Sequence, residues 1–401
     1  MRKISLLSGS IATLLSLNVY AGGYQLQEYS ISNLGRAFAG AGVVGDDYSA
    51  IAFNPAAISL KDTGFQLGAS EVIIKVESKG EIIPSSADTA TKNAKITQYL
   101  TVPHFFTQKK LNDKFNVAFG FYVPYGLGYK YNSDWYGRTH ALETKIETFD
   151  LALAGSYKIT DKLSFGLSAI AERYDARLTN FVKPINSESV IEGNDWTNLW
   201  NTGLTYRFND KSTFGIAYRS KAIFDLKGKH RFEGGSWDGR KGKVSAKIVL
   251  PEHILASYSQ NIGKFTLSTS ARWTRWTRFK TLAINSTLAS ASVDENWGNT
   301  WTISGGVDYK INKNWIIRTG LAYDEAGVKD SQHRTARIPD GDRWLVSAGF
   351  TYLKNNYQWD FGYTHMFLDT TRANHNDEKS QLDAKYDMGL ILFGAQFQYH
   401  F

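Results

Sequence analysis

Apolar and polar residues alternate with a period of two over long stretches of this chain. At the C-terminus, every second residue from Gly389 to Phe401 is apolar or aromatic, whereas the residues between them become polar towards the end. The same alternation recurs over 357–368, 344–352 and 115–123. Because successive side chains of a β-strand point to opposite faces of the sheet, this pattern predicts strands with two different faces.

The alternating stretches add up to fourteen predicted strands, joined by two kinds of connection. The strands are expected at 63–77, 94–108, 114–125, 142–158, 162–180, 197–208, 212–227, 243–259, 263–283, 298–310, 314–326, 342–353, 357–369 and 388–401. Short polar turns join some neighbours, as at 160–162 and 209–211. Longer charged loops are expected at 183–196, 228–242, 285–298, 327–341 and 370–386. Short turns at one end, long loops at the other and an even strand count are typical of outer-membrane barrels.

A soluble β-sandwich is the alternative, but its strands are usually only about 5–6 residues long. A barrel of fourteen strands is too wide for its own side chains to fill, so the lumen must be plugged or open. Residues 22–62 lack the alternation and contain a small-residue tract from Gly35 to Gly42, which favours close packing and short helices. We therefore predict an all-β fold, a fourteen-stranded antiparallel transmembrane barrel over 63–401 that is plugged by an N-terminal hatch over 22–62.

The first 21 residues have the pattern of a secretory signal peptide. Arg2 and Lys3 precede an apolar stretch over 4–17, and small residues lead to Ala21. The stretch is too short for a spanning helix, and a short buried N-terminal helix is the alternative. No later segment contains 18 consecutive uncharged apolar residues. Because only helices and closed barrels satisfy the backbone in lipid, a membrane location requires the barrel.

Composition excludes several classes of function. The chain of 401 residues has no cysteine, so disulfides, thiolate zinc sites and cysteine nucleophiles are absent. The eight histidines show no metal-binding spacing, and the G-x-G-x-x-G tract at 40–45 lacks the strand and helix of a dinucleotide site, so we expect no metal and no cofactor. The net charge of +8 is dispersed along the chain. This charge favours contact with anionic lipopolysaccharide rather than with nucleic acid.

A series of short motifs carries a family resemblance. They lie at 24–28, 34–40, 46–47, 54–56, 218–220, 250–252, 318–324 and 338–343. Together, and in this order, they resemble the FadL family of outer-membrane transporters for hydrophobic compounds, close to its long-chain fatty acid transporters. The resemblance implies a monomeric transporter, not an enzyme, in the Gram-negative outer membrane. It also implies passive uptake, with the ligand leaving sideways through an opening in the barrel wall.

The resemblance assigns gating roles to three motifs. Tyr24 matches an aromatic residue beside an inner ligand pocket, where movement releases the ligand, and an anchor for the plug is the alternative role. Asn54, Pro55 and Ala56 match the hatch motif, although proline restricts the preceding residue to extended geometry and a structural turn is the rival interpretation. Gly126 follows a proline that removes a ladder donor, at the position of the family's inward kink. A plain strand end is the alternative there.

The basic residues expected to bind a ligand carboxylate are not found at the matching positions of this chain. The family has a basic residue late in the fifth strand and another on the ninth, and these positions are Asn180 and Ala283 here. Arg177, Arg278 and Lys280 lie nearby and are candidate substitutes. However, Arg177 is three residues from Asn180, which places it on the opposite strand face unless a bulge intervenes.

Apolar inner faces at 366–368 and 388–392 offer a lining for an acyl chain, which gains roughly 0.8 kcal/mol per buried CH₂ group, or they pack against the plug. Long-chain fatty acids are therefore the leading substrates, and aromatic or alkane hydrocarbons are the alternative. A general diffusion porin and an outer-membrane phospholipase are more remote alternatives. The remaining expected partners are outer-membrane lipid and the barrel assembly machinery.

Overall fold

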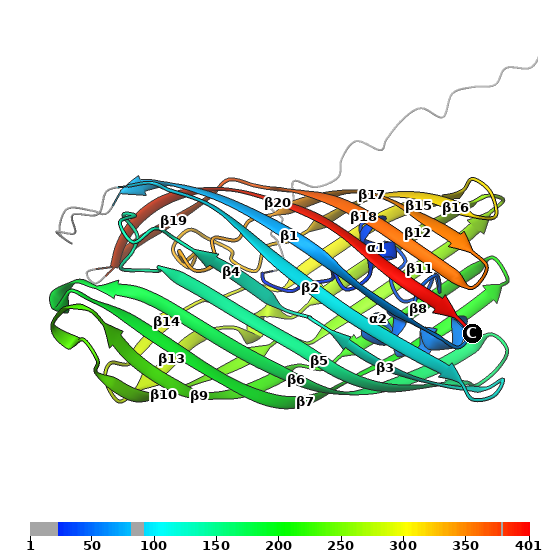
Figure 1. The fold of residues 1–401 in the computed structure, drawn as a ribbon, viewed down its shortest axis with the longest axis horizontal. Helices are drawn as coiled ribbons and strands as arrows, with labels where there is room; N and C mark the ends of the chain where they lie inside the picture. The colour runs from blue at the N-terminus through cyan, green and yellow to red at the C-terminus, as the bar shows by residue number, and fades with distance from the viewer. Residues whose placement is uncertain (1–22, 82–91, 378–379) are drawn as a thin grey trace, which may run out of the picture.

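The computed structural model describes residues 23–81, 92–377 and 380–401, so the predicted signal peptide at 1–21 lies outside the described residues. Antiparallel strands form a single closed sheet (Figure 1). The strands are β1 (Gly64–Glu81), β2 (Ala94–Lys110), β3 (Phe115–Tyr122), β4 (Gly126–Lys130), β5 (Glu143–Lys158), β6 (Leu163–Val182), β7 (Ser187–Asn209), β8 (Ser212–Arg219), β9 (Ala222–Glu233), β10 (Lys241–Leu250), β11 (His253–Ile262), β12 (Phe265–Thr274), β13 (Thr281–Ser286), β14 (Ala291–Asp294), β15 (Thr300–Lys310), β16 (Trp315–Asp324), β17 (Arg343–Lys354), β18 (Tyr357–Leu368), β19 (Thr371–Asp377) and β20 (Ser380–His400).

These strands make fourteen passes, because six passes are each interrupted once. The interrupted passes are β3 with β4, β8 with β9, β10 with β11, β12 with β13, β14 with β15, and β18 with β19. Each pass pairs with the next one along the chain, and β20 pairs with β1 from His400 opposite Gly64 to Asp383 opposite Glu81. The predicted fourteen-stranded antiparallel barrel is confirmed.

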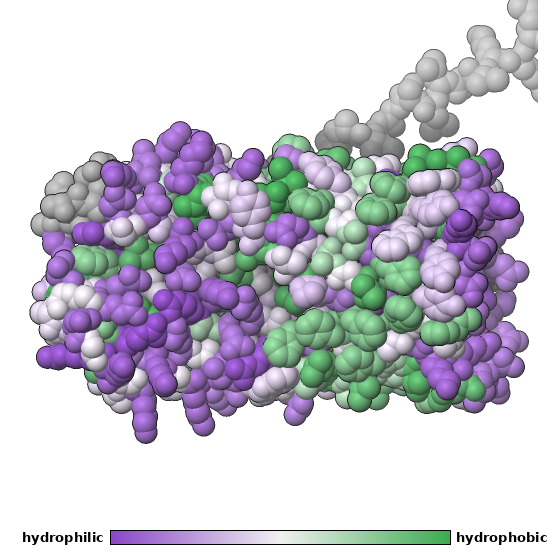
Figure 2. All heavy atoms as spheres, viewed as in Figure 1, coloured by the Kyte–Doolittle hydropathy of each residue, from purple (hydrophilic) through white to green (hydrophobic). Residues whose placement is uncertain are grey.

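Two of the predicted loops are wrong. Strand β7 begins at Ser187 within the loop expected at 183–196, and β19 and β20 occupy most of 370–386. Figure 2 shows the reason, since apolar residues form a band over the half of the barrel near the short turns, whereas hydrophilic residues cover the other half. The strands continue beyond the apolar band with charged outward side chains, so no hydrophobic alternation marks them in the sequence.

The segment from 23 to 63 lies inside the barrel (Figure 1). Its short helices are α1 (Ile31–Leu34), α2 (Ala50–Phe53) and η1 (Pro55–Leu60), and further 3₁₀ turns elsewhere are η3 (Lys183–Ile185), η4 (Gly235–Trp237) and η5 (Trp276–Arg278). The Ser30 side chain caps α1 by accepting a hydrogen bond from the backbone N–H of Asn33. Helix α1 packs against β17 and β18, and η1 packs against β5, β6 and β7. None of the helices among the described residues is long and apolar enough to cross a membrane.

Glycines in the wall let this interior segment approach closely. A Cβ atom on Gly166 of β6 would lie 2.2 Å from the backbone nitrogen of Ala56, and one on Gly320 of β16 would lie 2.2 Å from the carbonyl carbon of Arg36. No side chain fits at such distances, so these wall positions require glycine. The fit fixes the position of the N-terminal segment along the barrel axis.

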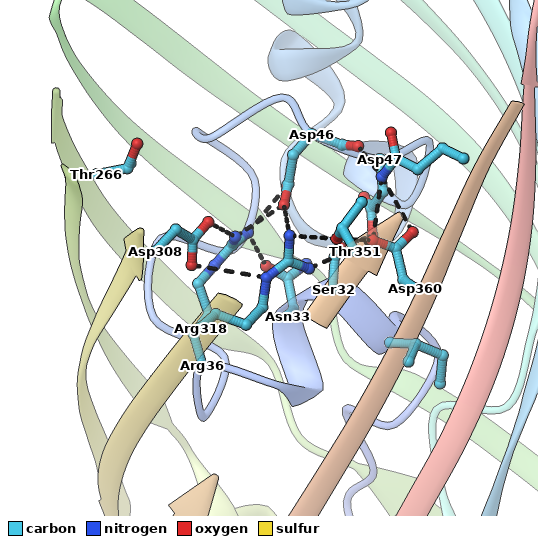
Figure 3. A network of polar contacts seen from close by, with 12 residues as sticks. Ser32, Asn33, Arg36, Asp46, Asp47, Thr266, Asp308, Arg318, Thr351 and Asp360 are labelled. Carbon is cyan, nitrogen blue, oxygen red and sulfur yellow. Dashed lines mark hydrogen bonds and ion pairs between the residues drawn. The ribbon is translucent and has the colours of Figure 1, made fainter. Parts of the chain in front are cut away.

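A buried ionic network joins the segment to the wall (Figure 3). Arg36 forms ion pairs of 2.8 Å with both Asp46 and Asp308. Arg318 on β16 lies 3.5 Å from Asp360 and 3.6 Å from Asp46. Because a buried charge is costly without a partner, each member of this network depends on the others. The network anchors the interior segment to β15, β16 and β18.

Candidate ligand cavities and wall opening

An apolar cavity of about 710 Å³, here called cavity A, lies inside the barrel. Its wall comes mainly from inward residues of β5, β6, β7, β9, β10 and β13, and the N-terminal segment adds Tyr24. The aliphatic lining consists of Ile146, Ala176, Leu178, Ile191, Leu226, Val244, Ala246, Ile248, Leu282 and Ile284. Outward neighbours of these residues alternate with them along each strand, so the two-residue period predicted from the sequence builds the cavity.

A second apolar cavity of about 690 Å³, here called cavity B, lies on the other side of Tyr24. Its lining includes Leu26, Val72, Ile74, Leu100, Val102, Gly126, Leu127, Met366, Leu368, Met388 and Leu390. The predicted inner face at 366–368 therefore lines a cavity, and of the face predicted at 388–392, Met388 and Leu390 line it whereas Leu392 does not. Both cavities are lined by Tyr24 and Ile338, so these two side chains stand between them.

Tyr24 is held by aromatic rings and by the backbone. Its side chain is only 3% exposed, and its ring centroid lies 5.8 Å from Tyr125, 5.4 Å from Trp276 and 6.1 Å from Trp297. The backbone N–H of Gly126 donates to the Tyr24 carbonyl at 3.1 Å. The contacts are mainly apolar and edge-on, so the ring can rotate without leaving a buried charge unpaired. The partition between the cavities therefore consists of the Tyr24 ring, packed among aromatic residues, together with Ile338.

The barrel wall is interrupted beside cavity B. Strand β2 pairs with β3 only between Phe105 and Lys110, and β4 pairs with β5 only. Among the described residues, 94–104 of β2 have no ladder partner on the side that faces β4. Leu100 of β2 and Leu127 of β4 line cavity B from the two sides of this interruption. Cavity B thus reaches a place where the wall lacks backbone hydrogen bonds.

The basic side chain of Arg337, in the loop between β16 and β17, lines cavity A. Arg337 precedes the motif at 338–343, and its guanidinium donates to the Glu143 carbonyl at 3.2 Å and to the Asn180 side-chain oxygen at 3.5 Å. Burial lowers the pKa of Arg337 to about 10, which leaves the group protonated at neutral pH. Both of these hydrogen-bond acceptors are neutral oxygens. A negatively charged ligand group would therefore form a charge-assisted hydrogen bond that these two partners do not provide.

A carboxyl group shares the cavity with this cation. Glu295, which follows β14, lines cavity A and accepts a hydrogen bond of 3.1 Å from the indole N–H of Trp297. Burial raises the pKa of Glu295 to about 7, although the Trp297 hydrogen bond and the charge of Arg337 act in the opposite direction. The polar part of cavity A therefore changes charge near neutral pH.

Three predicted gating residues lie at the contact between plug and wall. Asn54 donates from its amide to the Leu204 carbonyl at 3.1 Å and accepts from the N–H of Ala56, while Pro55 begins η1. None of the three lines cavity A or cavity B. The geometry is that of a capped turn pressed against the wall, and a gating role for it stays a prediction.

The remaining candidate site residues lie in different environments. Gly126 lines cavity B at the interruption of the wall, and Asn180 contacts Arg337. Arg177 forms ion pairs with Glu143 and Glu192 and lines neither cavity, because β6 keeps its register with β7 through this region. Lys280 is exposed and also lines neither cavity. These positions do not favour the head-group roles predicted for the two basic residues.

The sequence analysis missed Arg337 and Glu295 as cavity residues. Arg337 directly precedes the motif at 338–343, which was the available signal. Glu295 stands in a charged loop that gives no pattern of its own.

A closed fourteen-pass barrel with an interior segment and apolar cavities defines a class of outer-membrane transport protein. This chain belongs to that class, because residues 12–401 match the family described as "Outer membrane protein transport protein (OMPP1/FadL/TodX)". A long-chain fatty acid transport protein of Salmonella typhi is 28% identical over 426 residues, covering 97% of this chain and 96% of that protein. Outer membrane protein P1 of Haemophilus influenzae is 27% identical over 398 residues, covering 86% of each.

Solved structures share the fold. A FadL homologue of Pseudomonas aeruginosa superposes with a TM-score of 0.85 at 24% identity, over 94% of this chain and 99% of that one. The toluene transporter TodX of Pseudomonas putida gives a TM-score of 0.71 at 15% identity, over 88% of this chain and 94% of that one. At these identities, the likeness concerns the fold alone.

Proposed function

We propose that this outer-membrane transporter takes up long-chain fatty acids by passive diffusion. The observation that carries the proposal is the placement of Tyr24 between two apolar cavities, the second of which reaches an interruption of the wall. A ligand held in cavity A would pass Tyr24 into cavity B and leave between β2 and β4 into the outer leaflet. No energy source is needed, because the apolar chain moves from one apolar environment to another.

The lining of cavity A suits an acyl chain. Most of the side chains that line it are apolar, with a few polar groups at Glu295 and Arg337. Each CH₂ group buried there contributes about 0.8 kcal/mol. Arg337 would bind the carboxylate, since guanidinium groups form strong charge-assisted hydrogen bonds with carboxylates. The similar proteins named long-chain fatty acid transport proteins support the same substrate class.

Aromatic hydrocarbons are a second candidate substrate class. The rings of Tyr24 and Phe279 line cavity A and pack against Trp276 and Trp297, whose own rings lie 4.8 Å apart behind them. Such a cluster can stack on a planar ligand. Competition between toluene and radiolabelled oleate for the purified protein separates the two classes, because a protein selective for fatty acids should release oleate only to other long-chain acids.

Uptake of radiolabelled oleate by cells that lack their own carrier tests the main proposal. Expression of this protein should increase uptake, and Ala176→Trp should abolish the increase, because the new side chain fills cavity A. Ala169→Trp on the same strand is the matched control, since Ala169 faces outward and lies in the exposed face of β6. Unchanged uptake on expression, or equal uptake by the two variants, would contradict the proposal.

The remaining parts of the proposal concern processing and assembly. Residues 1–21 would be removed as a signal peptide, and the barrel assembly machinery would insert a hatch of 22–62 within a barrel of 63–401. The sheet closes by pairing of β1 with β20, so neither terminal strand is free to pair with a second copy, which favours a monomer.

A further inference from the structure

A groove with several lysines crosses the outside of the barrel, in the hydrophilic half that lies away from the short turns. Along β9 and β10 the inward residues line cavity A, and Lys227, Lys229, Lys243 and Lys247 are exposed on the outer face, with Lys227 and Ser245 also contributing to the lining of cavity A. Shallow hollows beside them are lined by Lys227, Lys243, Lys247, Ser245 and Asn285. In Figure 2 the surface over this part of the barrel, at lower left, is hydrophilic. We call these five residues together with Lys229 the lysine groove.

The strand register brings like charges together in the groove. Lys229 of β9 lies directly opposite Lys243 of β10, and like charges at opposed positions destabilise a sheet. Glu192 of β7 is the acidic neighbour of Lys229, but its carboxylate is already bound by Arg177 and by Arg231 at 2.6 Å. Asp225 lies opposite Lys247, and Asp195 of β7 and Glu233 of β9 are further acids near this surface. No ion pair within 4.0 Å involves the four lysines of the groove, as far as the described chain extends.

The limited pairing between β10 and β13 shapes the groove. Strand β13 pairs with β10 over three residues only, Val244–Ala246, and the chain then turns away. The amide of Asn285 and the hydroxyl of Ser245 are left exposed beside the lysines. Amide and hydroxyl groups donate hydrogen bonds to phosphate and sugar oxygens, and ammonium groups bind phosphate as point charges.

The distance of the lysine groove from the apolar band indicates which ligand can reach it. Ile223 of β9 is the last exposed apolar residue before the lysines, and Val249 lies opposite it. Lys247, Lys227 and Lys229 follow two, four and six residues further from the band, or roughly 7 to 20 Å along the strands at about 3.4 Å per residue. The phosphate groups of an outer-leaflet glycolipid occupy this level, just beyond the hydrocarbon. Basic side chains at such a level bind anionic lipid head groups.

We propose that the lysine groove binds the phosphate groups of lipopolysaccharide in the outer leaflet. The charge on the groove matches a ligand with several phosphates, and the exposed amide and hydroxyl groups match its sugars. The wall interruption takes no part in this contact, and the groove shares only Lys227 and Ser245 with the lining of cavity A. Bound glycolipid would neutralise the opposed lysines and tighten β9 against β10.

The unfolding temperature of the full-length protein in lipid nanodiscs tests this proposal. Lipid A with both phosphates should raise the unfolding temperature of the native protein, and lipid A without phosphates should not. The effect should disappear in K227Q/K229Q/K243Q and persist in K162Q/K211Q/K313Q. The second variant removes the same charge from the short turns at the opposite end of the barrel. Retention of the heat-modifiable band on gels verifies that both variants fold.

Three outcomes of this assay would contradict the proposal. An equal shift in both triple variants would mean that net charge, and not the groove, binds the lipid. An equal shift with dephosphorylated lipid A would remove phosphate as the recognised group. A full shift produced by inorganic phosphate alone would assign the groove to a soluble anion instead of a lipid. Weakening by added salt is expected because the contact is electrostatic and exposed.

Discussion

At the scale of single residues, ligand selectivity depends on Arg337. It is the basic side chain that lines cavity A close to Asn180, whereas the basic residues expected from the sequence point elsewhere. Its position could not be predicted because the loop that carries it crosses back over the barrel mouth, and no periodic pattern describes such a path. Tyr24 was predictable, since it opens the motif at 24–28 that contributes to the family resemblance.

Replacement of Arg337 should separate charged from neutral ligands. Arg337→Gln is expected to weaken oleate binding by roughly tenfold or more, since a hydrogen bond to a charged group contributes about 1.5–3 kcal/mol. Binding of methyl oleate should not change, because the ester carries no charge. Competition against a radiolabelled fatty acid measures both ligands. Lys280→Gln is the matched control with the same loss of charge, and an equal effect there would remove Arg337 as the head-group cation.

Glu295 should make ligand affinity depend on pH. Its pKa is raised to about 7 by burial, so the carboxyl is mostly neutral near about pH 6 and mostly ionised near about pH 8. An ionised Glu295 repels an anionic head group beside Arg337, so affinity should fall as pH rises, by roughly three- to tenfold. An alkyl sulfonate is the suitable ligand, because its own charge stays constant over this range.

Two variants assign this pH dependence to its source. Glu295→Gln should keep the higher affinity across the range. His333→Asn should retain the pH dependence, although the imidazole also acts on the pKa of Glu295. If the profile of the native protein is flat, or if loss of His333 flattens it, the assignment to Glu295 is wrong.

At the scale of elements, the sequence predicted the strands that lie in the apolar band. The alternation over 115–123 and 357–368 corresponds to β3 and β18, because lipid on one side and the lumen on the other impose opposite polarities. The same logic fails for β19 and the first residues of β20, which stand in water on their outer face. The interruption after β3 was predicted as a kink, but the absence of pairing between β2 and β4 depends on the relative position of two strands, which the pattern within either strand does not contain.

A reversible cross-link across this interruption tests whether the ligand leaves there. Leu100→Cys with Gly128→Cys should form a disulfide, because a Cβ atom on Gly128 would lie 3.0 Å from the Leu100 side chain and the chain has no other cysteine. Oleate uptake should fall under oxidising conditions and recover on reduction. A cysteine pair at the opposed outward positions Leu153 and Ala169 is the control, since β5 and β6 are already fully paired there. Unchanged uptake in the oxidised Leu100–Gly128 form would exclude this exit.

At the scale of the whole molecule, the barrel is useful as a transporter only if its interior segment keeps ions out. A barrel of fourteen passes is wide enough to conduct, and what opposes conduction is a segment held by the ionic network around Arg36. The two cavities are lined by residues within 23–28 of this segment but by none of the residues of the ionic network. The ligand route and the anchoring network are therefore separate, which predicts that they can be disrupted one at a time.

Arg36→Met should loosen the interior segment without filling either cavity. Removal of one partner of a buried ion pair typically costs about 3–5 kcal/mol, because Asp46 and Asp308 would be left buried with less compensation. In planar bilayers the native protein should show no large steady current, whereas the variant should show frequent openings. Arg372→Met is the matched control, since its ion pair with Asp383 is exposed and should not affect conductance. Large steady currents through the native protein would instead identify an open pore, and the anchoring network would then have no sealing role.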